Sequence, residues 1–326
     1  MLVIETKGLS KSYREVRALR ALDLEVRKGE IFGLLGRNGA GKTTCVKILL
    51  GIVRKSGGEA RLLGEPAGTV ASRRRVGYLP EGHDFPDYHT PWSALDYLGG
   101  LSEMPRTERR ARIPPLLDAV GLQKWHHVKI RKFSKGMKQR LGLAHAMLHK
   151  PEVIFLDEPT DGVDPVGRRE IRDIMVRLKA EGHTIFLNSH LLSEVEMICD
   201  RVTIIENGET VKSGHVEELT RVGDYWVFDL AGPVAAAVAE LAVRWPGARL
   251  TGAEMEVPMA DPVGLDPLVD FLRERRISIR GLRQKKVTLE DVFLSLVAGG
   301  AGAAVSSGAA VPAGATGAAA AKGPTA

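Results

Sequence analysis

The sequence has little cysteine and no long apolar run. Cys45 and Cys199 are the only cysteines in 326 residues and fit no metal-binding spacing, so we expect two buried, reduced thiols. No apolar run approaches the roughly 20 residues that cross a bilayer. The N-terminal residues 1–5 also lack the basic start and apolar core of a signal peptide. We therefore expect a globular chain that stays in the cytosol.

The chain carries a modest excess of positive charge. It has 46 basic and 40 acidic residues, a net charge of +6. This excess suits nucleic acid, an anionic membrane surface, a phosphate ligand or ordinary surface variation, so charge alone does not decide the function. The densest basic cluster lacks aromatic residues for base stacking. We expect it to be a solvated face, with a binding patch as the alternative. It comprises Arg273, Arg275, Arg276, Arg280, Arg283, Lys285 and Lys286.

A phosphate-binding motif is the most informative feature that is present. It reads Gly36-Arg37-Asn38-Gly39-Ala40-Gly41-Lys42-Thr43-Thr44 and directly follows the apolar segment 31–35. In this strand-to-helix context, the glycines let backbone N–H groups curl around phosphates, and the next helix points its positive end at them. Lys42 reaches the outer phosphates, and the Thr43 hydroxyl is placed to hold Mg²⁺. The motif predicts a nucleoside triphosphate site, with a plain glycine turn as the alternative.

Residues 1–220 alternate between apolar strands and helical stretches. This alternation predicts an α/β fold with a mostly parallel sheet. The strand candidates are residues 31–35, 76–79, 153–156, 184–187 and 202–205.

Helical periodicity dominates residues 84–150, which predicts a helical insertion. We expect it to be broken by three proline sites: Pro91, Pro105 and the Pro114-Pro115 pair. Its last helix has one apolar stripe with three polar residues off it. The stripe is Met137, Leu141, Ala144 and Leu148, and the off-stripe residues are Lys138, Gln139 and His145.

The pattern changes after residue 220. Strand-like segments at 225–230 and 277–282, with helical segments at 234–243 and 265–275, predict a small α+β domain over residues 221–297. Residues 298–326 are almost entirely Ala, Gly, Val, Ser, Thr and Pro, with too little apolar bulk to offset the entropy of ordering. We expect a disordered tail there.

Residues able to perform chemistry follow three strand candidates. The first strand leads into the phosphate loop, another ends in Asp157-Glu158, and a third ends in Asn188-Ser189-His190. Ligands of open α/β sheets sit beyond the carboxyl ends of the strands, so we expect the three ends to share one crevice. Asp157 would then be the metal carboxylate and Glu158 the base that polarises a water for attack on the γ-phosphate. The alternative for this pair is a helix N-cap, and for a lone His190 a structural hydrogen bond.

A second motif resembles the signature of a known family. Residues 133–140 read Phe-Ser-Lys-Gly-Met-Lys-Gln-Arg and resemble the signature of ATP-binding-cassette (ABC) ATPases, in a form similar to exporters whose membrane subunit is separate. The usual Leu-Ser-Gly-Gly-Gln is altered, but Ser134 and Gly136 keep a hydroxyl and backbone N–H groups for an anion. The resemblance implies a phosphate-loop core with a mostly parallel sheet, an antiparallel β portion and a helical insertion. It also implies ATP and Mg²⁺ as cofactors.

The resemblance implies roles for single residues. Ser134 and Gly136 would contact the γ-phosphate of an ATP held by a second subunit, which implies a head-to-tail homodimer or pseudo-dimer. Tyr13 resembles the aromatic that stacks on adenine, with an ordinary strand or turn tyrosine as the alternative. Glu81 stands where the family normally has Gln, so it could contact Mg²⁺ or its water but adds a negative charge. His190 resembles the switch histidine at the γ-phosphate.

Two further segments correspond to family contacts. Residues 160–164 resemble the dimer-contact loop, with a matching Asp164 and atypical residues before it. Residues 82–88 lie where the family couples the nucleotide state to the membrane subunit, and exposed aromatics there would suit a docking groove. The alternative is a loop that packs on the helical insertion. Residues 288–293 also resemble C-terminal segments of exporter ATPases.

These features lead to the hypothesis of an ATP-hydrolysing ABC exporter subunit. It would drive a separate multi-span permease from the cytoplasmic side of the inner membrane, as a peripheral protein. An ABC ATPase acting on nucleic acid or the ribosome is the alternative, but such relatives usually have two cassettes or a long coiled-coil insertion, and neither is present. We therefore do not expect nucleic acid as a partner. The intact Asp157, Glu158 and His190 argue against a regulatory protein that holds ATP with little turnover.

Overall fold

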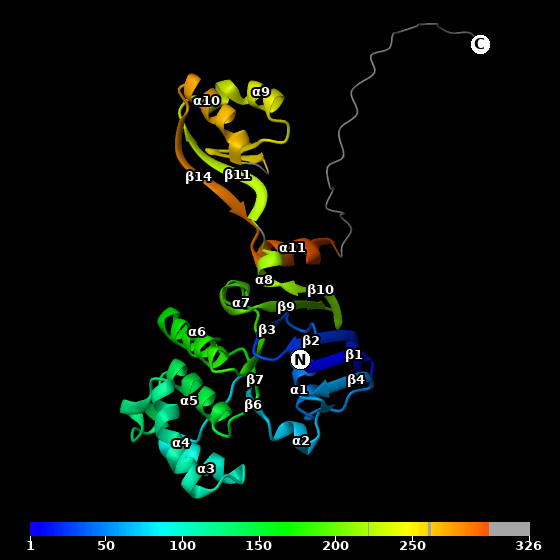
Figure 1. Ribbon diagram of the computed structural model, residues 1–326, viewed down its shortest axis with the longest axis vertical. Coiled ribbons are helices and arrows are strands. Elements are labelled where there is room, and N and C mark those ends of the chain that lie inside the picture. The colour runs from blue at the N-terminus through cyan, green and yellow to red at the C-terminus, as the bar shows by residue number, and fades with distance from the viewer. Residues whose placement is uncertain (221, 260–261, 300–326) are drawn as a thin grey trace, which may run out of the picture.

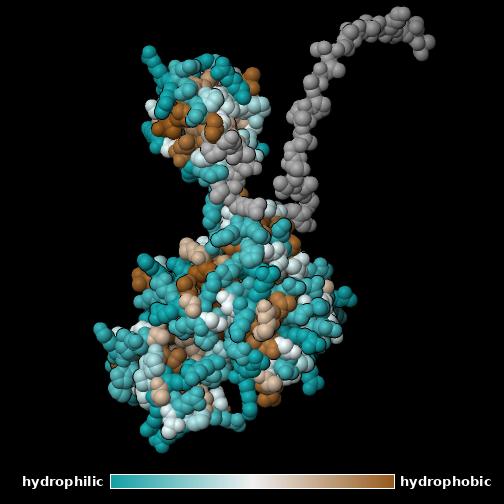
Figure 2. Space-filling view, in the orientation of Figure 1, coloured by the Kyte–Doolittle hydropathy of each residue, from teal (hydrophilic) through white to brown (hydrophobic). Residues whose placement is uncertain are grey.

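The computed structural model describes residues 1–220, 222–259 and 262–299 (Figure 1). The disordered tail predicted from residue 298 lies outside these residues, apart from its first two positions. Within the described part of the chain, no helix combines the length and apolar character needed to cross a membrane. Residues 1–220 are called the cassette below; their visible face is mostly hydrophilic, with small scattered apolar areas (Figure 2).

A ten-stranded sheet organises residues 1–220, in the order β5-β4-β1-β2-β10-β9-β3-β8-β7-β6. The adjacent strands β9, β3, β8, β7 and β6 pair in parallel, whereas β1 pairs with β2 and β4, and β10 with β9, in antiparallel fashion. This arrangement confirms the predicted parallel sheet with an antiparallel portion. The strands are β1 (Leu2–Tyr13), β2 (Val16–Arg27), β3 (Ile31–Leu35), β4 (Gly57–Leu62), β5 (Glu65–Pro66), β6 (Val76–Leu79), β7 (Val153–Asp157), β8 (Thr184–Asn188), β9 (Arg201–Glu206) and β10 (Glu209–His215).

The parallel strands are apolar because both sheet faces are covered. Every residue of β3, β7 and β8 is buried. Phe186 packs between Phe32 and Phe155, with ring centroids 5.5 and 5.0 Å away. Cys45 and Cys199 are buried and free, as expected, and burial raises the pKa of the Cys45 thiol to about 12. The ends of these rigid strands therefore provide a fixed platform for the site.

Short helices surround this sheet. They are α1 (Lys42–Leu49), α2 (Val70–Arg73), α6 (Pro165–Ala180), α7 (Leu192–Ile198) and α8 (Val216–Leu219). Helix α1 follows β3, α6 follows β7, and α7 follows β8. The longest of these, α6, is amphipathic and buries one face.

The helical insertion lies between β6 and β7, as predicted. It contains α3 (Pro91–Leu101), α4 (Arg106–Ala119), α5 (Lys135–Met147) and the 3-10 turns Gln123–Trp125 and Ile130–Lys132. Pro91 opens α3 behind a Thr90–Ser93 capping box. The expected break at Pro114-Pro115 is wrong, because α4 continues through both prolines and is anchored on either side by the buried Ile113 and Leu117.

Helix α5 is more buried than its predicted apolar stripe. Leu141, Ala144 and Leu148 are buried as expected, and Met137 is half-buried. Gln139, expected off the stripe, is only 4% exposed. The reason is that α5 contacts β6 as well as α3, α4 and α6, so more than one of its faces is covered.

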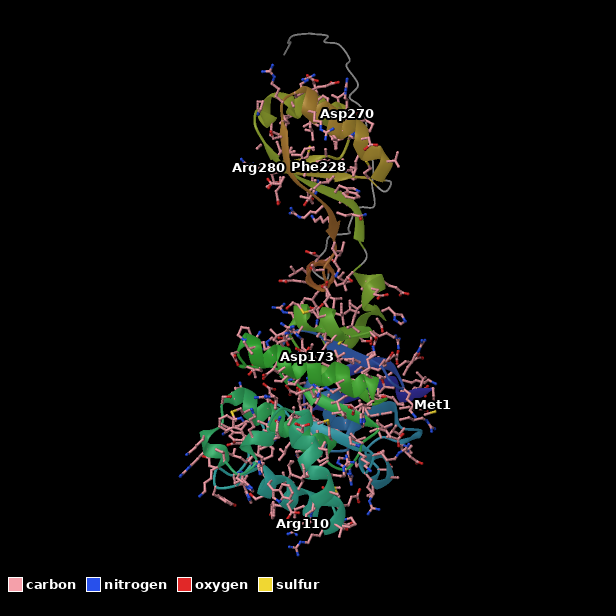
Figure 3. The ribbon with its side chains drawn as sticks, turned by 60° about the vertical axis from the view of Figure 1, so that its left-hand side comes forward. Met1, Arg110, Asp173, Phe228, Asp270 and Arg280 are labelled. Atoms are coloured by element: carbon pink, nitrogen blue, oxygen red, sulfur yellow. The ribbon has the colours of Figure 1, made fainter. Side chains whose placement is uncertain are left out.

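Residues after 221 form a separate four-stranded sheet in the order β12-β13-β11-β14. Its core is a third hydrophobic cluster that includes Phe228, Met255 and Phe271, and the unit lies beyond α8, away from the cassette (Figures 1 and 3). The predicted strands and helices are present, whereas β12 and β13 were not predicted. The elements are β11 (Val222–Ala231), α9 (Val234–Arg244), β12 (Arg249–Thr251), β13 (Glu254–Pro258), the 3-10 turn Pro262–Leu265, α10 (Asp266–Glu274) and β14 (Ser278–Lys286).

Several residues of the basic cluster are neutralised by nearby carboxylates. Arg275 pairs with Glu240, and Arg283, Lys285 and Lys286 lie 2.7, 2.6 and 2.7 Å from Glu254, Glu256 and Glu196. This pairing favours the solvated face over a binding patch.

The last described helix, α11 (Leu289–Gly299), packs on α7 and α8 of the cassette. The division of the chain at residue 220 stays a proposal, and the predicted unit 221–297 includes most of α11. Leu289, the first residue of α11, is fully buried in a hydrophobic cluster of the cassette.

Candidate nucleotide-binding and catalytic site

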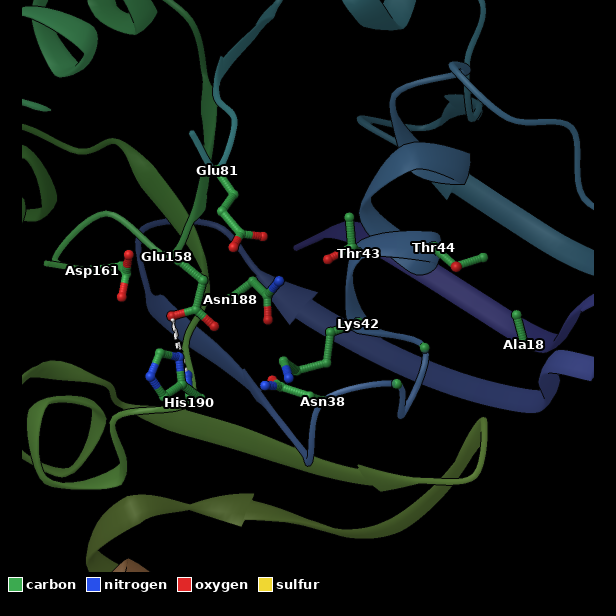
Figure 4. A pocket seen from close by; sticks show the side chains of 12 residues that line it. Ala18, Asn38, Lys42, Thr43, Thr44, Glu81, Glu158, Asp161, Asn188 and His190 are labelled. Carbon is green, nitrogen blue, oxygen red and sulfur yellow. Dashed lines mark hydrogen bonds and ion pairs between the residues drawn. The ribbon is translucent and has the colours of Figure 1, made fainter. Parts of the chain in front are cut away.

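A cavity of about 560 Å³ opens at the carboxyl ends of β3, β7 and β8 (Figure 4). The ends of these three strands are therefore adjacent, as their sequence patterns predicted. The cavity is lined by Ala18, Asn38, Gly39, Gly41, Lys42, Thr43, Thr44, Glu81, Glu158, Asp161, Asn188 and His190.

The glycines of the phosphate loop are required by close backbone approach. Gly41 has φ 106°, and a Cβ there would lie 2.5 Å from the Ala18 carbonyl oxygen. A Cβ on Gly36 would lie 2.4 Å from the Ile205 carbonyl oxygen. The loop thus packs tightly against β2 and β9, and α1 begins at Lys42 with its first residues facing the cavity. Free N–H groups at such a helix start favour an anion.

Lys42 is a buried cation at the base of the loop. It is 6% exposed, and its Nζ donates to the carbonyl oxygens of Gly36 at 2.7 Å and Arg37 at 3.3 Å. Burial lowers the pKa of Lys42, while the charges of Glu158, Asp157 and Glu81 oppose that shift. An anionic phosphate would compensate this desolvated charge.

Asp157 and Asn188 form a pair at the ends of β7 and β8. The Asn188 amide donates to Asp157 Oδ1, and both residues are almost fully buried. Burial raises the pKa of Asp157, the Asn188 hydrogen bond opposes the rise, and the charges of Glu81 and Glu158 add to it. A cation near this carboxylate would relieve the penalty on its charged form.

Glu158 is held in an uncommon backbone conformation. Its φ is 51°, unusual for a residue with a side chain, and its N–H donates to the Asn188 carbonyl at 2.9 Å. The His190 Nδ1 lies 2.8 Å from Glu158 Oε2, and the His190 N–H donates to the same oxygen at 3.3 Å. Glu158 is 7% exposed, so the carboxylate is aimed into the cavity by its backbone and by His190 together.

The oxygen-rich donors suit a hard divalent cation. Thr43, Glu81 and Glu158 line the cavity, and Asp157 is adjacent to Glu158. In the described part of the chain, no three His, Cys, Asp or Glu side chains could hold a metal by themselves. Mg²⁺ is usually bound by one or two carboxylates together with substrate phosphates, and Glu81 and Glu158 offer carboxylates at this cavity.

Seven of the predicted site residues do not line this cavity: Tyr13, Gly36, Arg37, Ala40, Ser134, Gly136 and Asp157. Ser134 is exposed and caps α5, accepting from the Met137 N–H at 3.3 Å, and Gly136 is the second residue of that helix. Tyr13 is 43% exposed at the end of β1, with Lys11 Nζ 4.7 Å from its ring centroid. The cassette thus separates the signature from the phosphate loop of the same chain.

Two phosphate-loop residues line a neighbouring cavity of about 380 Å³ instead. Gly36 and Arg37 lie there with Asn38, His190, Leu192 and Phe293. Ala40, also in the predicted loop, is buried beneath it.

Sequence reasoning missed the roles of Asn188 and Asp161. Asn188 was noted only as part of a strand end, although it directly follows three apolar residues, much as Asp157 follows four. Asp161 lies 3.0 Å from Lys135, which follows Ser134. This ion pair links the loop after β7 to the start of α5.

The segment predicted to face a membrane partner lines a different cavity, of about 530 Å³. Phe85 is buried and packs edge-on against His83 and His145, whereas Tyr88 is 70% exposed. Phe85 thus packs on the helical insertion, which was the alternative for this segment, whereas Tyr88 is exposed at the surface. The lining also includes Leu79, Leu98 and His149.

The histidines of this cavity make stability depend on pH. Burial lowers the pKa of His145, and the charges of His149 and His83 lower it further; burial also lowers the pKa of His149. The folded protein keeps these rings neutral where the unfolded chain protonates them. Stability is therefore fully present above the ordinary histidine pKa of about 6.5 and is lost as pH falls toward the folded-state pKa.

Calorimetry at pH 7 and at pH 5.5 measures how far the Tm falls on acidification. We expect this fall to be about 2–4 °C smaller in the double variant His145→Gln/His149→Gln than in the wild type. The exposed His127→Gln is the control and should follow the wild-type slope. An unchanged slope in the double variant would contradict the assignment.

Known proteins are similar to this chain in sequence and in fold. Residues 19–161 match the family model described as ABC transporter. An ABC transporter ATP-binding protein of Synechocystis sp. is 50% identical over 302 residues, covering 90% of this chain and 84% of the relative. The bacitracin transport ATP-binding protein BcrA of Enterococcus faecalis is 35% identical, covering 91% and 97%. The solved structure of an ATP-binding subunit of an ABC transporter has a TM-score of 0.60 at 30% identity, covering 67% of this chain and 91% of that one.

Proposed function

The chain belongs to the ATP-binding proteins of ABC transporters, and on that premise we propose that it hydrolyses ATP as a head-to-tail dimer that drives a separate membrane permease. The observation that carries the proposal is the convergence of Lys42, Glu158 and His190 on one cavity. These groups meet the needs of phosphate binding, water activation and stabilisation of the base.

In this mechanism the phosphate loop and Lys42 bind the triphosphate. Thr43 and Asp157, with Glu81 beside them, would hold Mg²⁺, which supplies neutralisation of charge on the β- and γ-phosphates when bound. Glu158 accepts a proton from a water aligned with the γ-phosphate. His190 holds the Glu158 carboxylate in place through the 2.8 Å contact.

The dimer is proposed because the residues predicted to contact phosphate lie at two separate places on the chain, the cavity and the start of α5. Ser134 and Gly136 lie outside the cavity that contains Lys42, so their N–H and hydroxyl groups would need an ATP held by another copy. The Lys135–Asp161 ion pair holds that signature beside the loop after β7. ATP that binds both surfaces favours the closed dimer over the open one.

A permease partner is proposed from relatives and from the cavity around residues 79–89. One relative is named for bacitracin transport and another for Nod factor export. The exposed Tyr88 beside an apolar cavity suits a helix of a membrane subunit. In this proposal the chain is peripheral on the cytoplasmic side of the membrane, and export is the direction.

The proposal is tested by ATPase assays and by affinity purification. Purified protein should release phosphate from ATP with Mg²⁺, and EDTA should remove that activity. Purification from membranes in mild detergent, followed by mass spectrometry, should recover a multi-span protein. Recovery of soluble partners alone, or salt-sensitive binding of RNA or DNA, would contradict the transporter assignment.

A further inference from the structure

Helix α11 ties the C-terminal unit to the cassette (Figure 1). Leu289, its first residue, is fully buried in the same cluster as Val195 of α7. Val292, Phe293 and Leu296 pack against that cluster along one side of α11. Burial of a complete leucine side chain stabilises a contact by roughly 1.5–3 kcal/mol relative to exposure. The helix is therefore an integral part of the cassette surface.

One carboxylate on α7 holds the junction that precedes α11. Glu196 accepts from Lys286 Nζ at 2.7 Å through one oxygen and from the Leu289 N–H at 2.9 Å through the other. Lys286 ends β14 and Leu289 begins α11. The Glu196 side chain is only 15% exposed, which strengthens charge-assisted hydrogen bonds of this kind. The carboxylate thus fixes the end of the C-terminal sheet to α7.

Helix α7 begins two residues after His190. Its first residue, Leu192, lines the cavity of about 380 Å³ together with His190 and Phe293. Phe293 comes from α11, so this helix supplies an apolar wall beside the histidine that contacts Glu158. The His190 side chain is 44% exposed and contacts Glu158 through Nδ1, so its orientation depends on the backbone of residues 190–192 and on the groups beside it.

We propose that Glu196 and Phe293 are positioning residues for His190. Glu196 anchors α11, Phe293 packs α11 against the start of α7, and α7 in turn holds His190 on Glu158. The inference rests on the proposed ATP hydrolysis and adds a structural link through which the C-terminal unit acts on that site.

The test compares Phe293→Ala with Leu294→Ala in the full chain. Leu294 is the next residue on α11 and is 57% exposed, so it controls for a general effect on the helix. We expect Phe293→Ala to lower kcat about tenfold, as a small misplacement of a catalytic group does. The Kd for ATP should stay within about twofold, because the phosphate loop is untouched. Phe293→Leu should restore most of the activity, and Leu294→Ala should resemble the wild type.

Amide hydrogen exchange gives a readout that is independent of activity. Phe293→Ala and Glu196→Ala should both speed exchange over residues 190–198, with no change in the phosphate loop. The positioning role is overturned if both variants keep wild-type kcat and exchange, or if Phe293→Ala and Leu294→Ala have equal effects. If the wild type hydrolyses no ATP, the proposed function fails, and the exchange result still decides whether α11 orders residues 190–198.

Discussion

Glu158→Gln is expected to lower the kcat of ATP hydrolysis by about 10²–10⁴-fold, the range for loss of a general base. Gln keeps the shape of the side chain and still accepts the His190 N–H, but it cannot take a proton from water. ATP affinity should stay within about threefold, because Lys42 and the phosphate loop are unchanged. Phosphate release and binding of a fluorescent ATP analogue measure the two quantities.

Asp173→Asn on α6 is the matched control for this substitution. Asp173, labelled in Figure 3, is exposed and does not line the cavity, so loss of its charge should leave kcat within about twofold of the wild type. Full activity in Glu158→Gln would remove this residue as the base, and a parallel loss in Asp173→Asn would indicate a non-specific charge effect.

Lys42→Met is expected to raise the Kd for ATP by about 10–150-fold, the equivalent of the 1.5–3 kcal/mol that a hydrogen bond to a charged group contributes. Met retains the apolar stem without the ammonium group. Since burial lowers the pKa of Lys42, its removal also relieves a desolvation cost, and the Tm without ATP should be equal to or higher than that of the wild type. Calorimetry of binding and of unfolding measures both effects.

Lys47→Met on the same helix is the control. Lys47 lies in the last turn of α1 and outside the cavity, so ATP affinity should change little. Wild-type affinity in Lys42→Met would show that this cation does not contact the phosphates.

The position of the candidate site could be predicted because its determinants are local. The glycine spacing before Lys42 requires a particular turn, and apolar runs buried on both faces identify parallel strands whose ends coincide. Asp157, Glu158 and His190 each directly follow or lie close to such an end. No long-range information was needed to bring them together.

Other features depend on contacts that sequence periodicity does not contain. The strands β12 and β13 have only three and five residues, so each gives a weak pattern, although the alternation of Glu254, Met255, Glu256 and Val257 in β13 is itself typical of a strand. Phe85 is buried because it packs against His145 of α5. Gln139 is buried because α5 contacts β6, α3, α4 and α6. The amide of Asn188 gains its role from Asp157 on a neighbouring strand.

The packing of α11 on α7 could not be predicted for a similar reason. Its sequence adjoins β14, which favoured one C-terminal unit, but its apolar face matches the surface of α7. The bond from Leu289 to Glu196 spans 93 positions in the chain, a separation at which helical periodicity gives no information about the partner.

The mass of the ATP-bound protein tests the composite site most directly. Light scattering of Glu158→Gln with Mg²⁺ and ATP should give about twice the 35.3 kDa mass of one chain, with two ATP per dimer. Adding Ser134→Asp keeps a good N-cap on α5 but places a negative charge where the partner's γ-phosphate would lie. That double variant should bind ATP and remain a monomer. A monomeric Glu158→Gln with ATP bound, or a dimer that is indifferent to Ser134→Asp, would contradict a site shared between two copies.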